Sequence, residues 1–317
     1  MTAFITGVCG FAGRHLAAHL LGRGVTVCGT YLDAADRRGI GSLGRHVGLH
    51  KADVRDPARL RSILRRTRPD VVYHLAAQAS VGSSFASPVS TVDVNVSGTA
   101  ALLEAVRHES PRARVLFAST AEVYGKVRPR DVPLTETHPV APRNPYAASK
   151  LAAEELCRQY ARTWDLRIVI ARSFNHTGPG QATGFVIPDF ASQIARLERG
   201  RGRARMKVGN LNARRDLSDV RDIVRGYDLL ARKGRPGEVY HLGTGRAHRI
   251  ADLLTLMLAL ARRPVDVVPD PARRRPTDVP VLAASVRKVR RQTGWRVTIP
   301  LARTLADTLE YWRCDGH

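Results

Sequence analysis

Short apolar runs alternate with helical stretches along the first 170 residues, and this alternation restricts the possible folds more than any other feature. Strands are expected at residues 3–6, 26–30, 48–52, 71–75, 115–118 and 166–171. Helices are expected between them at residues 11–21, 57–66, 95–108 and 146–163. Strands joined by helices of this length form βαβ units, whose strands pair in parallel. The pattern predicts an α/β fold, with a Rossmann-type, doubly wound parallel sheet over residues 1–172.

The second half of the chain has shorter elements and more Pro and Arg, and residues 199–205 are expected to be a solvated connection. A chain of 317 residues can hold a second domain. We expect a smaller α/β domain for the substrate at residues 173–317, with some of the chain crossing back to the first domain. Its core should come from residues 239–242, 253–260 and a last helix at 301–312.

The composition is that of a globular enzyme-sized chain, with 44% hydrophobic and 25% charged residues, which excludes disorder. No apolar run approaches the roughly 18 residues of a membrane span. The N-terminus lacks the basic region of a signal peptide. The widely spaced cysteines follow no metal-ligand pattern, so we expect reduced thiols in the cytoplasm and no metal site; they are Cys9, Cys28, Cys157 and Cys314.

The net charge is unusually positive, because 51 basic and 28 acidic residues give 51 − 28 = +23. Such a surface could bind nucleic acid nonspecifically. It could also reflect an Arg-rich genome and attract small polyanionic substrates. The basic residues are scattered along the chain, without a helix-turn-helix, zinc-finger or RNA-binding signature. The pattern favours a phosphate-bearing small substrate and no nucleic-acid partner.

Three glycines lie at the first strand-to-helix junction with the spacing G-x-x-G-x-x-G. Glycine allows the backbone to turn tightly there and lets a pyrophosphate approach the N–H groups at the helix N-terminus. This position predicts a dinucleotide site, whose contacts would come from Gly7, Gly10, Phe11, Ala12 and Gly13.

The end of the second strand distinguishes NAD from NADP, because an acidic residue there binds the ribose 2′-OH and repels a 2′-phosphate. No acid stands near Gly29; Asp33 follows four residues later, with Arg37 and Arg38 beyond it. The pattern favours NADP(H) and leaves NAD(H) possible. After the third strand, Asp53 is placed to bind the adenine amino group, or alternatively to cap the next helix.

Tyr146 and Lys150 are separated by one helical turn, so both side chains lie on one face of their helix. A lysine ammonium lowers the pKa of a nearby phenol and allows it to act as an acid or base near neutral pH. Thr120, at the end of the preceding strand, can hydrogen-bond the same substrate oxygen. These three residues are the predicted catalytic group.

Together with the glycine motif, this combination resembles the extended short-chain dehydrogenase/reductases that act on nucleotide sugars. The resemblance covers essentially the whole chain and is carried by HLAAQ at 74–78, NVSGT at 95–99, STAEVYG at 119–125 and PYAASK at 145–150. The second half is similar to the branch of GDP-4-keto-6-deoxymannose reductases and GDP-mannose 4,6-dehydratases, through SFNHTGPGQ at 173–181, RDLSDVRD at 215–222, DP at 270–271 and RPTDV at 275–279. The first of these runs is closer to the reductases.

The resemblance implies NAD(P)H-dependent reduction of the C4 ketone of a GDP-4-keto-6-deoxyhexose, in deoxysugar biosynthesis. It also implies a homodimer formed through helices 95–108 and 146–163. Further cofactor contacts, beside Tyr146 and Lys150, would come from Val54, Leu75, Ala76, Ala77, Gln78 and His176.

Several residues within these motifs have the chemistry to hold the substrate. The guanidinium groups of Arg215 and Arg275 suit a pyrophosphate, and Asp278 could accept hydrogen bonds from ribose hydroxyls. Asn175 could bind a phosphate or sugar oxygen, and Ser84 could contact the sugar. For each residue the alternative is a surface ion pair or a turn.

A 4,6-dehydratase or a 4-epimerase on the same fold remains an alternative. A dehydratase must also remove the C5 proton and expel the C6 hydroxyl, which requires a base and an acid beside the threonine. Glu122 could be that base, but Ala121 cannot donate a proton, which argues against elimination. A cofactor-binding regulator without activity is disfavoured because Tyr146 and Lys150 are both present.

Overall fold

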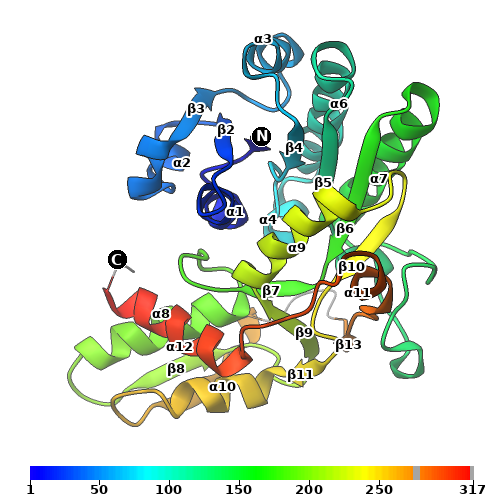
Figure 1. Ribbon diagram of the computed structural model, residues 1–317. Coiled ribbons are helices and arrows are strands. Elements are labelled where there is room, and N and C mark those ends of the chain that lie inside the picture. The colour runs from blue at the N-terminus through cyan, green and yellow to red at the C-terminus, as the bar shows by residue number, and fades with distance from the viewer. Residues whose placement is uncertain (274–278, 315–317) are drawn as a thin grey trace.

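The computed structural model describes residues 1–273 and 279–314. Its main feature is a seven-stranded sheet in the order β10-β6-β5-β4-β1-β2-β3, in which every neighbouring pair is parallel (Figure 1). The predicted Rossmann-type architecture is confirmed. The strands are β1 (Thr2–Thr6), β2 (Thr26–Tyr31), β3 (Val47–Lys51), β4 (Val71–His74), β5 (Arg114–Thr120), β6 (Arg167–Ser173) and β10 (Val239–Leu242).

Helices cover both faces of this sheet. On one face α1 packs against α9, and α9 also contacts β5 and β6. On the other face α3, α6 and α7 lie side by side (Figure 1). Two separate apolar clusters fill the two sides, one containing Leu16 and Tyr227 and the other Leu60 and Leu102. These helices are α1 (Phe11–Leu21), α3 (Pro57–Thr67), α6 (Gly98–Glu109), α7 (Pro145–Trp164) and α9 (Val220–Lys233).

Local capping explains where two of these helices begin. Asn144 accepts a hydrogen bond from the Ala147 N–H at 2.8 Å, and Pro145 occupies the first turn of α7. The cap of α3 is Asp56, whose carboxylate accepts from the Arg59 N–H at 2.9 Å. The alternative role of Asp53 as the cap of α3 is therefore wrong, because Asp56 is the residue directly before the first helical turn and caps the helix.

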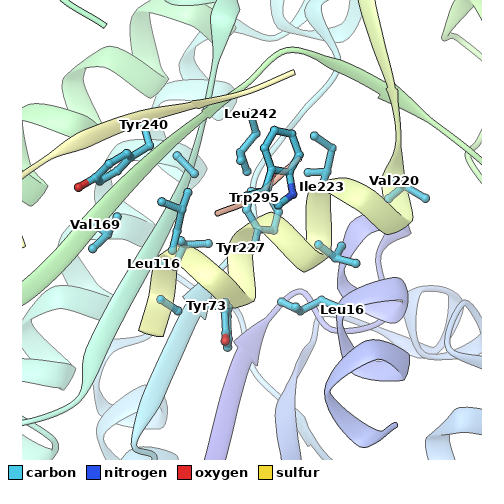
Figure 2. Close-up of a cluster of buried hydrophobic side chains, with 14 of the residues drawn as sticks. Leu16, Tyr73, Leu116, Val169, Val220, Ile223, Tyr227, Tyr240, Leu242 and Trp295 are labelled. Atoms are coloured by element: carbon cyan, nitrogen blue, oxygen red, sulfur yellow. The ribbon is translucent and has the colours of Figure 1, made fainter. Parts of the chain in front are cut away.

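One prediction about the second half of the chain is corrected. Residues Val239–Leu242 do not contribute to a separate core but form β10, the edge strand beside β6. Leu242 packs in the same apolar cluster as Trp295 and Tyr227 of α9 (Figure 2). A four-residue apolar run carries no signal of the sheet it joins, so the sequence could not place this strand. The chain thus crosses back to the first domain after residue 173.

The smaller lobe contains a four-stranded sheet, a two-stranded sheet and three packed helices. Its apolar cluster includes Leu253, Met257, Leu305 and Leu309, so the predicted contributions of residues 253–260 and of the last helix are confirmed. The elements are β7 (Asn175–Thr177), β8 (Arg205–Val208), β9 (Arg214–Asp219), β11 (Ala247–Arg249), β12 (Asp266–Pro269), β13 (Val281–Leu282), α8 (Val186–Arg199), α10 (Ile250–Leu258) and α12 (Leu301–Cys314).

Shorter elements complete the described chain. They are α2 (Ala34–Arg38), α4 (Val81–Ala86), α5 (Pro88–Val92), α11 (Arg287–Thr293), the 3₁₀ turns η1 (Gly41–His46), η3 (Ala121–Tyr124), η4 (Pro129–Asp131) and η5 (Pro271–Arg273), and the π-helical turn η2 (Asp93–Ser97). Within the described ranges, none of the helices has the length and apolarity to cross a membrane.

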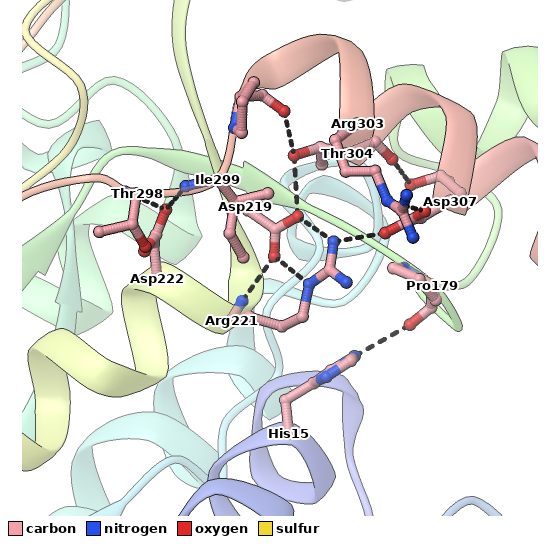
Figure 3. Close-up of polar contacts among 12 residues, drawn as sticks. His15, Pro179, Asp219, Arg221, Asp222, Thr298, Ile299, Arg303, Thr304 and Asp307 are labelled. Atoms are coloured by element: carbon pink, nitrogen blue, oxygen red, sulfur yellow. Dashed lines mark hydrogen bonds and ion pairs between the residues drawn. The ribbon is translucent and has the colours of Figure 1, made fainter.

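Polar contacts join the two lobes at the start of α9 (Figure 3). The Asp219 carboxylate caps α9 by accepting from the Arg221 N–H, and it also accepts from the Thr304 hydroxyl of α12, each at 2.8 Å. Arg221 donates to Asp307 at 2.7 Å. Below this cluster, His15 of α1 lies 3.0 Å from the Pro179 carbonyl oxygen. The loop after β7 is thereby held over the first turns of α1.

Candidate active site

The glycine loop is built for the close approach of an anion. Gly7 has φ +69°, and a Cβ there would lie 3.1 Å from the Ala76 Cα. A Cβ on Gly13 would lie 2.2 Å from the Gly7 carbonyl oxygen, so only glycine permits this contact between helix and loop. At the cap position of α1, Gly10 offers no side chain to the N–H groups of Phe11 and Ala12. These N–H groups and the helix dipole fit a dinucleotide pyrophosphate.

The end of β1 is fastened to the segment that follows β4. The Thr6 hydroxyl accepts hydrogen bonds from the N–H groups of Leu75 and Ala76, at 3.2 and 3.1 Å, and lies 2.8 Å from His74 Nδ1. Because parallel strands end at one edge of the sheet, the glycine loop and residues 75–78 face the same region. Residues 75–78 are all half-buried there.

Asn95 is a buried organising residue that the sequence analysis did not identify. It accepts from the Gln78 N–H at 2.8 Å, and its amide donates to the Gln78 carbonyl at 3.2 Å and to Ser149 Oγ at 2.9 Å. Asn95 lies in the π-helical turn η2, a departure from helical geometry common at functional sites. In the sequence, Asn95 stood out only as the first residue of the NVSGT run at 95–99, which gave it no structural role.

The structure brings together the three predicted catalytic side chains. Tyr146 and Lys150 lie one turn apart on α7, and Thr120 ends β5. Burial raises the pKa of Tyr146, the hydrogen bond with Thr120 opposes this rise, and the nearby charge of Glu122 adds to it. A hydroxyl donor–acceptor pair of this kind can bind one substrate oxygen from two sides.

Lys150 is 4% exposed, and its Nζ lies 4.2 Å from the centre of the Phe117 ring. Burial lowers the pKa of Lys150 to about 8, against the smaller opposing effects of Cys157 and Glu154. The ammonium is therefore held beside the Phe117 ring, on the same helix as Tyr146.

Glu122 lies beside this group in η3. Its N–H donates to Thr120 Oγ1 at 3.2 Å, and Asn144 donates to its carboxylate at 3.3 Å. Asn144 also caps α7, so it joins Glu122 to the helix that carries Tyr146. Sequence analysis missed this role of Asn144. Ala121 is buried, so a methyl group occupies the position where elimination chemistry would need a proton donor.

His176 lies against the start of α1, next to the predicted pyrophosphate site. Its ring is parallel to that of Phe11, with 6.1 Å between the ring centres and 8° between the planes. The Nδ1 atom lies 3.1 Å from the Phe174 carbonyl oxygen, and burial lowers the pKa of the imidazole. His176 thus packs on Phe11 at the start of α1, and its contact with a cofactor stays a prediction.

The end of β2 carries no acidic side chain. Its Thr30 accepts from the N–H of Gly7 at 3.2 Å through its hydroxyl. Asp33 accepts from the Asp36 N–H at 2.8 Å as the cap of α2. Arg37 lies over the Tyr31 ring, 5.7 Å from its centre. A cationic group is therefore close to the strand end where NAD-binding proteins place an acid.

Asp53 is held by a neighbouring arginine. Its carboxylate accepts from the Arg55 backbone N–H at 2.9 Å and from the Arg55 guanidinium at 3.0 and 2.6 Å. Arg55 also donates to Asp93 at 2.6 Å. This pairing fixes the Asp53 carboxylate and lowers its pKa. Val54 is buried and packs closely against Gly98.

The predicted substrate residues differ in their accessibility. Asn175 is exposed on β7, and Arg215 is half-buried on β9, where it donates to the Val279 carbonyl oxygen. Ser84 is fully buried and donates to the Val81 carbonyl at 2.7 Å, which speaks against a contact with the sugar. Arg275 and Asp278 lie outside the described residues.

The buried ammonium of Lys150 predicts a measurable cost in stability. Its pKa in the folded chain, about 8, is below the unfolded value of about 10.4, so the cost is complete below pH 8 and disappears as pH rises through about 10.4. We expect Lys150→Met to raise the free energy of unfolding of the cofactor-free protein at pH 7 by about 1–3 kcal/mol. Urea denaturation measures the free energy of unfolding of the variant and the wild type at both pH values. The gain is expected at pH 7 and should be largely lost at pH 10.5.

Lys150→Arg keeps a positive charge and serves as the control, for which no gain is expected. Equal stability of Lys150→Met and the wild type at pH 7 would contradict the conclusion that burial of the Lys150 ammonium destabilises the folded chain.

Comparison with known proteins agrees with this geometry. Residues 4–308 match the family described as GDP-mannose 4,6 dehydratase. GDP-6-deoxy-D-mannose reductase from Pseudomonas aeruginosa is 36% identical over 309 residues, which cover 98% of this chain and 96% of the relative. A solved structure of RMD from Pseudomonas aeruginosa complexed with NADPH is 33% identical, with a TM-score of 0.86 and 98% of each chain covered.

A UDP-glucose 4-epimerase from Thermus thermophilus, solved in complex with NAD, is also similar. It is 30% identical, with a TM-score of 0.87, over 99% of this chain and 100% of its own. The match to the family covers nearly the whole chain, and the structure contains the predicted glycine loop and the predicted Thr-Tyr-Lys group. The chain belongs to the GDP-mannose 4,6-dehydratase family of the extended short-chain dehydrogenase/reductases, as an enzyme that depends on a pyridine nucleotide.

Proposed function

We propose that this enzyme reduces the C4 ketone of a GDP-4-keto-6-deoxyhexose. The observation that carries this proposal is the combination of a complete Thr120–Tyr146–Lys150 group with a buried methyl group at Ala121. Ketone reduction needs the Thr120–Tyr146–Lys150 group. Elimination of the C6 hydroxyl needs a proton donor at the position of Ala121, where this chain has only a methyl group. The similarity to a GDP-6-deoxy-D-mannose reductase supports the same reaction.

The side chains have distinct tasks in this reaction. A bound nicotinamide supplies the hydride for C4. Tyr146 gives its phenolic proton to the ketone oxygen, and Thr120 holds that oxygen by a hydrogen bond, so the product is an alcohol. Lys150 stabilises the phenolate that Tyr146 leaves behind, and a proton from solvent restores the phenol. For the substrate's pyrophosphate we propose Arg215 and Arg275, with Asp278 and Asn175 at hydroxyl or phosphate oxygens.

The alternative with a specific observation in its favour is a 4,6-dehydratase. Glu122 is half-buried beside Thr120 and is oriented by Asn144. It could remove the C5 proton and then return it to the leaving C6 hydroxyl, acting as base and acid in turn. A 4-epimerase would use the same Tyr146 and Thr120 and release a sugar with the opposite configuration at C4.

The substrate consumed and the mass of the product distinguish these reactions. We expect the protein with NADPH to reduce GDP-4-keto-6-deoxymannose, with loss of absorbance at 340 nm and a gain of two mass units in the sugar. We expect no change in mass when GDP-mannose is supplied with catalytic amounts of cofactor. Loss of the mass of water from GDP-mannose would establish the dehydratase instead.

Two variants assign the roles in that assay. Tyr146→Phe should lower kcat by about 10²–10⁴ while cofactor binding is nearly unchanged, since only the proton donor is lost. Glu122→Gln should leave ketone reduction within a fewfold of wild type. More than about a tenth of wild-type activity in Tyr146→Phe would remove Tyr146 from the mechanism.

We propose NADPH as the preferred cofactor. The end of β2 lacks an acid that would repel a 2′-phosphate, Asp33 is occupied as a helix cap, and Arg37 lies at the Tyr31 ring. The similar structures include one with NADPH and one with NAD, so both cofactors occur among proteins of this fold. We propose His176 and residues 75–78 for the nicotinamide side, and Asp53 and Val54 for the adenine.

Binding measurements check this preference. We expect NADPH to bind at least as tightly as NADH by fluorescence titration. Arg37→Ala should weaken NADPH severalfold and leave NADH unchanged, because NADH has no 2′-phosphate for this guanidinium to bind. Arg45→Ala, on the neighbouring turn η1, is the control. NADH binding about a hundredfold tighter would show that an acid, with Asp33 the nearest, reads the ribose.

We also propose that the enzyme is a homodimer in the cytoplasm. Large apolar side chains are exposed on α4 and α5, which pack beside α7: Phe85 at 41%, Val89 at 80% and Val92 at 46%. An exposed apolar group of this kind next to the long helix α7 is typical of a protein interface. The four cysteines form no disulfide, which suits a reducing compartment.

Sedimentation tests the dimer. The wild type is expected at twice the chain mass of 34.8 kDa, and Val89→Asp is expected to sediment as a monomer, because the interface would bury an unpaired charge. Val268→Asp, on the exposed strand β12, is the matched control and should remain dimeric. A monomeric wild type at micromolar concentration would contradict the proposal.

A further inference from the structure

A buried carboxylate lies one helical turn beyond Lys150. Glu154 accepts hydrogen bonds from Ser119 Oγ at 2.5 Å, from Arg172 Nε and Nη2 at 2.9 and 2.7 Å, and from Arg158 Nη2 at 2.9 Å. Glu154 and Arg172 are both almost completely inaccessible, so their paired charges are sheltered from solvent. The carboxylate is thus held from two strands and from its own helix.

Arg172 extends this cluster to the turn after β5. Its remaining guanidinium nitrogen donates to the Tyr124 hydroxyl at 2.8 Å, and the guanidinium lies 5.0 Å from the centre of the Tyr124 ring. The Tyr124 hydroxyl in turn lies 2.5 Å from His241 Nε2. Ser119, Arg172 and His241 are directly paired neighbours on β5, β6 and β10.

The segment Ser119–Tyr124 is consequently fastened to α7 at both of its ends. Ser119 reaches Glu154 directly, and Tyr124 reaches it through Arg172. Between these two points lie Glu122 and Thr120, the residue that holds the ketone oxygen with Tyr146 in the proposed reaction. Successive side chains of a strand point to opposite faces, so the bond made by Ser119 leaves Thr120 directed away from Glu154.

We propose that Ser119, Tyr124, Glu154 and Arg172 form a positioning cluster that sets Thr120 at its working distance from Tyr146 and Lys150. The proposal rests on the reaction proposed above, in which Thr120 and Tyr146 hold one oxygen. Neither Ser119 nor Tyr124 touches the substrate in that reaction; they act through Thr120 and the helix.

Energetics favour this role over a purely stabilising one. A buried ion pair gains little stability over apolar side chains of similar size, because desolvation of both charges offsets their attraction. Its hydrogen bonds are directional, however, whereas apolar contacts allow small displacements. Catalytic groups must be held within about 0.5 Å, and a misplacement of about 1 Å can lower the rate about a hundredfold.

Two variants each remove one hydroxyl group while the Glu154–Arg172 pair remains; the Tyr124 hydroxyl contacts His241 as well as Arg172. Ser119→Ala removes the direct link, and Tyr124→Phe removes the link through Arg172. The matched controls remove the same kind of bond elsewhere: Thr304→Val removes a hydroxyl donor to Asp219, and Tyr160→Phe removes a phenol donor to Glu104. All four positions are buried, so similar shifts of the thermal midpoint are expected.

The measurements are kcat and KM with NADPH and GDP-4-keto-6-deoxymannose, the NADPH dissociation constant, and the NMR signal of the Tyr146 ring in protein with labelled tyrosine. That signal is assigned by its loss in Tyr146→Phe. We expect Ser119→Ala and Tyr124→Phe to lower kcat about ten- to a hundredfold, with KM and NADPH affinity unchanged, and to shift the Tyr146 signal. The controls should retain kcat and the signal.

The results separate this proposal from the proposed function. Retention of wild-type kcat and of the Tyr146 signal in both variants overturns the positioning cluster. An equal loss of kcat in the controls also overturns it, because the effect would then follow from stability alone. If the wild type does not reduce the ketone, the proposed function fails, and the Tyr146 signal still decides whether the cluster positions the site.

Discussion

Parallel pairing of all seven strands forces every strand of the large sheet to end at the same edge, and the site depends on this constraint. β1 delivers Thr6 and the glycine loop, β4 delivers residues 75–78, and β5 delivers Thr120. The helix that follows β5 begins at this edge and brings Tyr146 beside Thr120. The topology thus places the predicted dinucleotide loop and the predicted catalytic group together before any side chain makes a specific contact.

The parts of the site that could be predicted from the sequence are those with a local pattern. The spacing of Tyr146 and Lys150 gives their common face directly, and the glycine loop is recognised by its position at the first strand-to-helix junction. Residues 239–242 were assigned to the wrong lobe because strand partners lie far away in the sequence. Asn95 and Asn144 were missed for a related reason: each is one polar residue whose partners belong to other elements.

Some of the arginines have a structural role that the composition did not reveal. Buried carboxylates recur in the described chain, and arginine reaches them from neighbouring elements. Asp228 accepts from His19, Arg23 and Arg232, so it joins α1 to α9. Arg221 connects Asp219 and Asp307 between the lobes in the same way. Part of the positive charge therefore fastens helices together, and only the remainder is available to attract an anionic substrate.

The state of the Tyr146 proton agrees with a reductive direction. Burial raises the pKa of Tyr146, which keeps the phenol protonated at neutral pH in the cofactor-free chain. A protonated phenol is the form that can give a proton to a ketone oxygen, whereas oxidation of an alcohol must begin from the phenolate. The hydrogen bond with Thr120 opposes the effect of burial, so the proton can still leave once the oxygen of C4 becomes basic. In the proposed reaction the phenol of Tyr146, the buried ammonium of Lys150 and the hydroxyl of Thr120 act together. The contacts that fix their relative positions therefore matter as much as their identities.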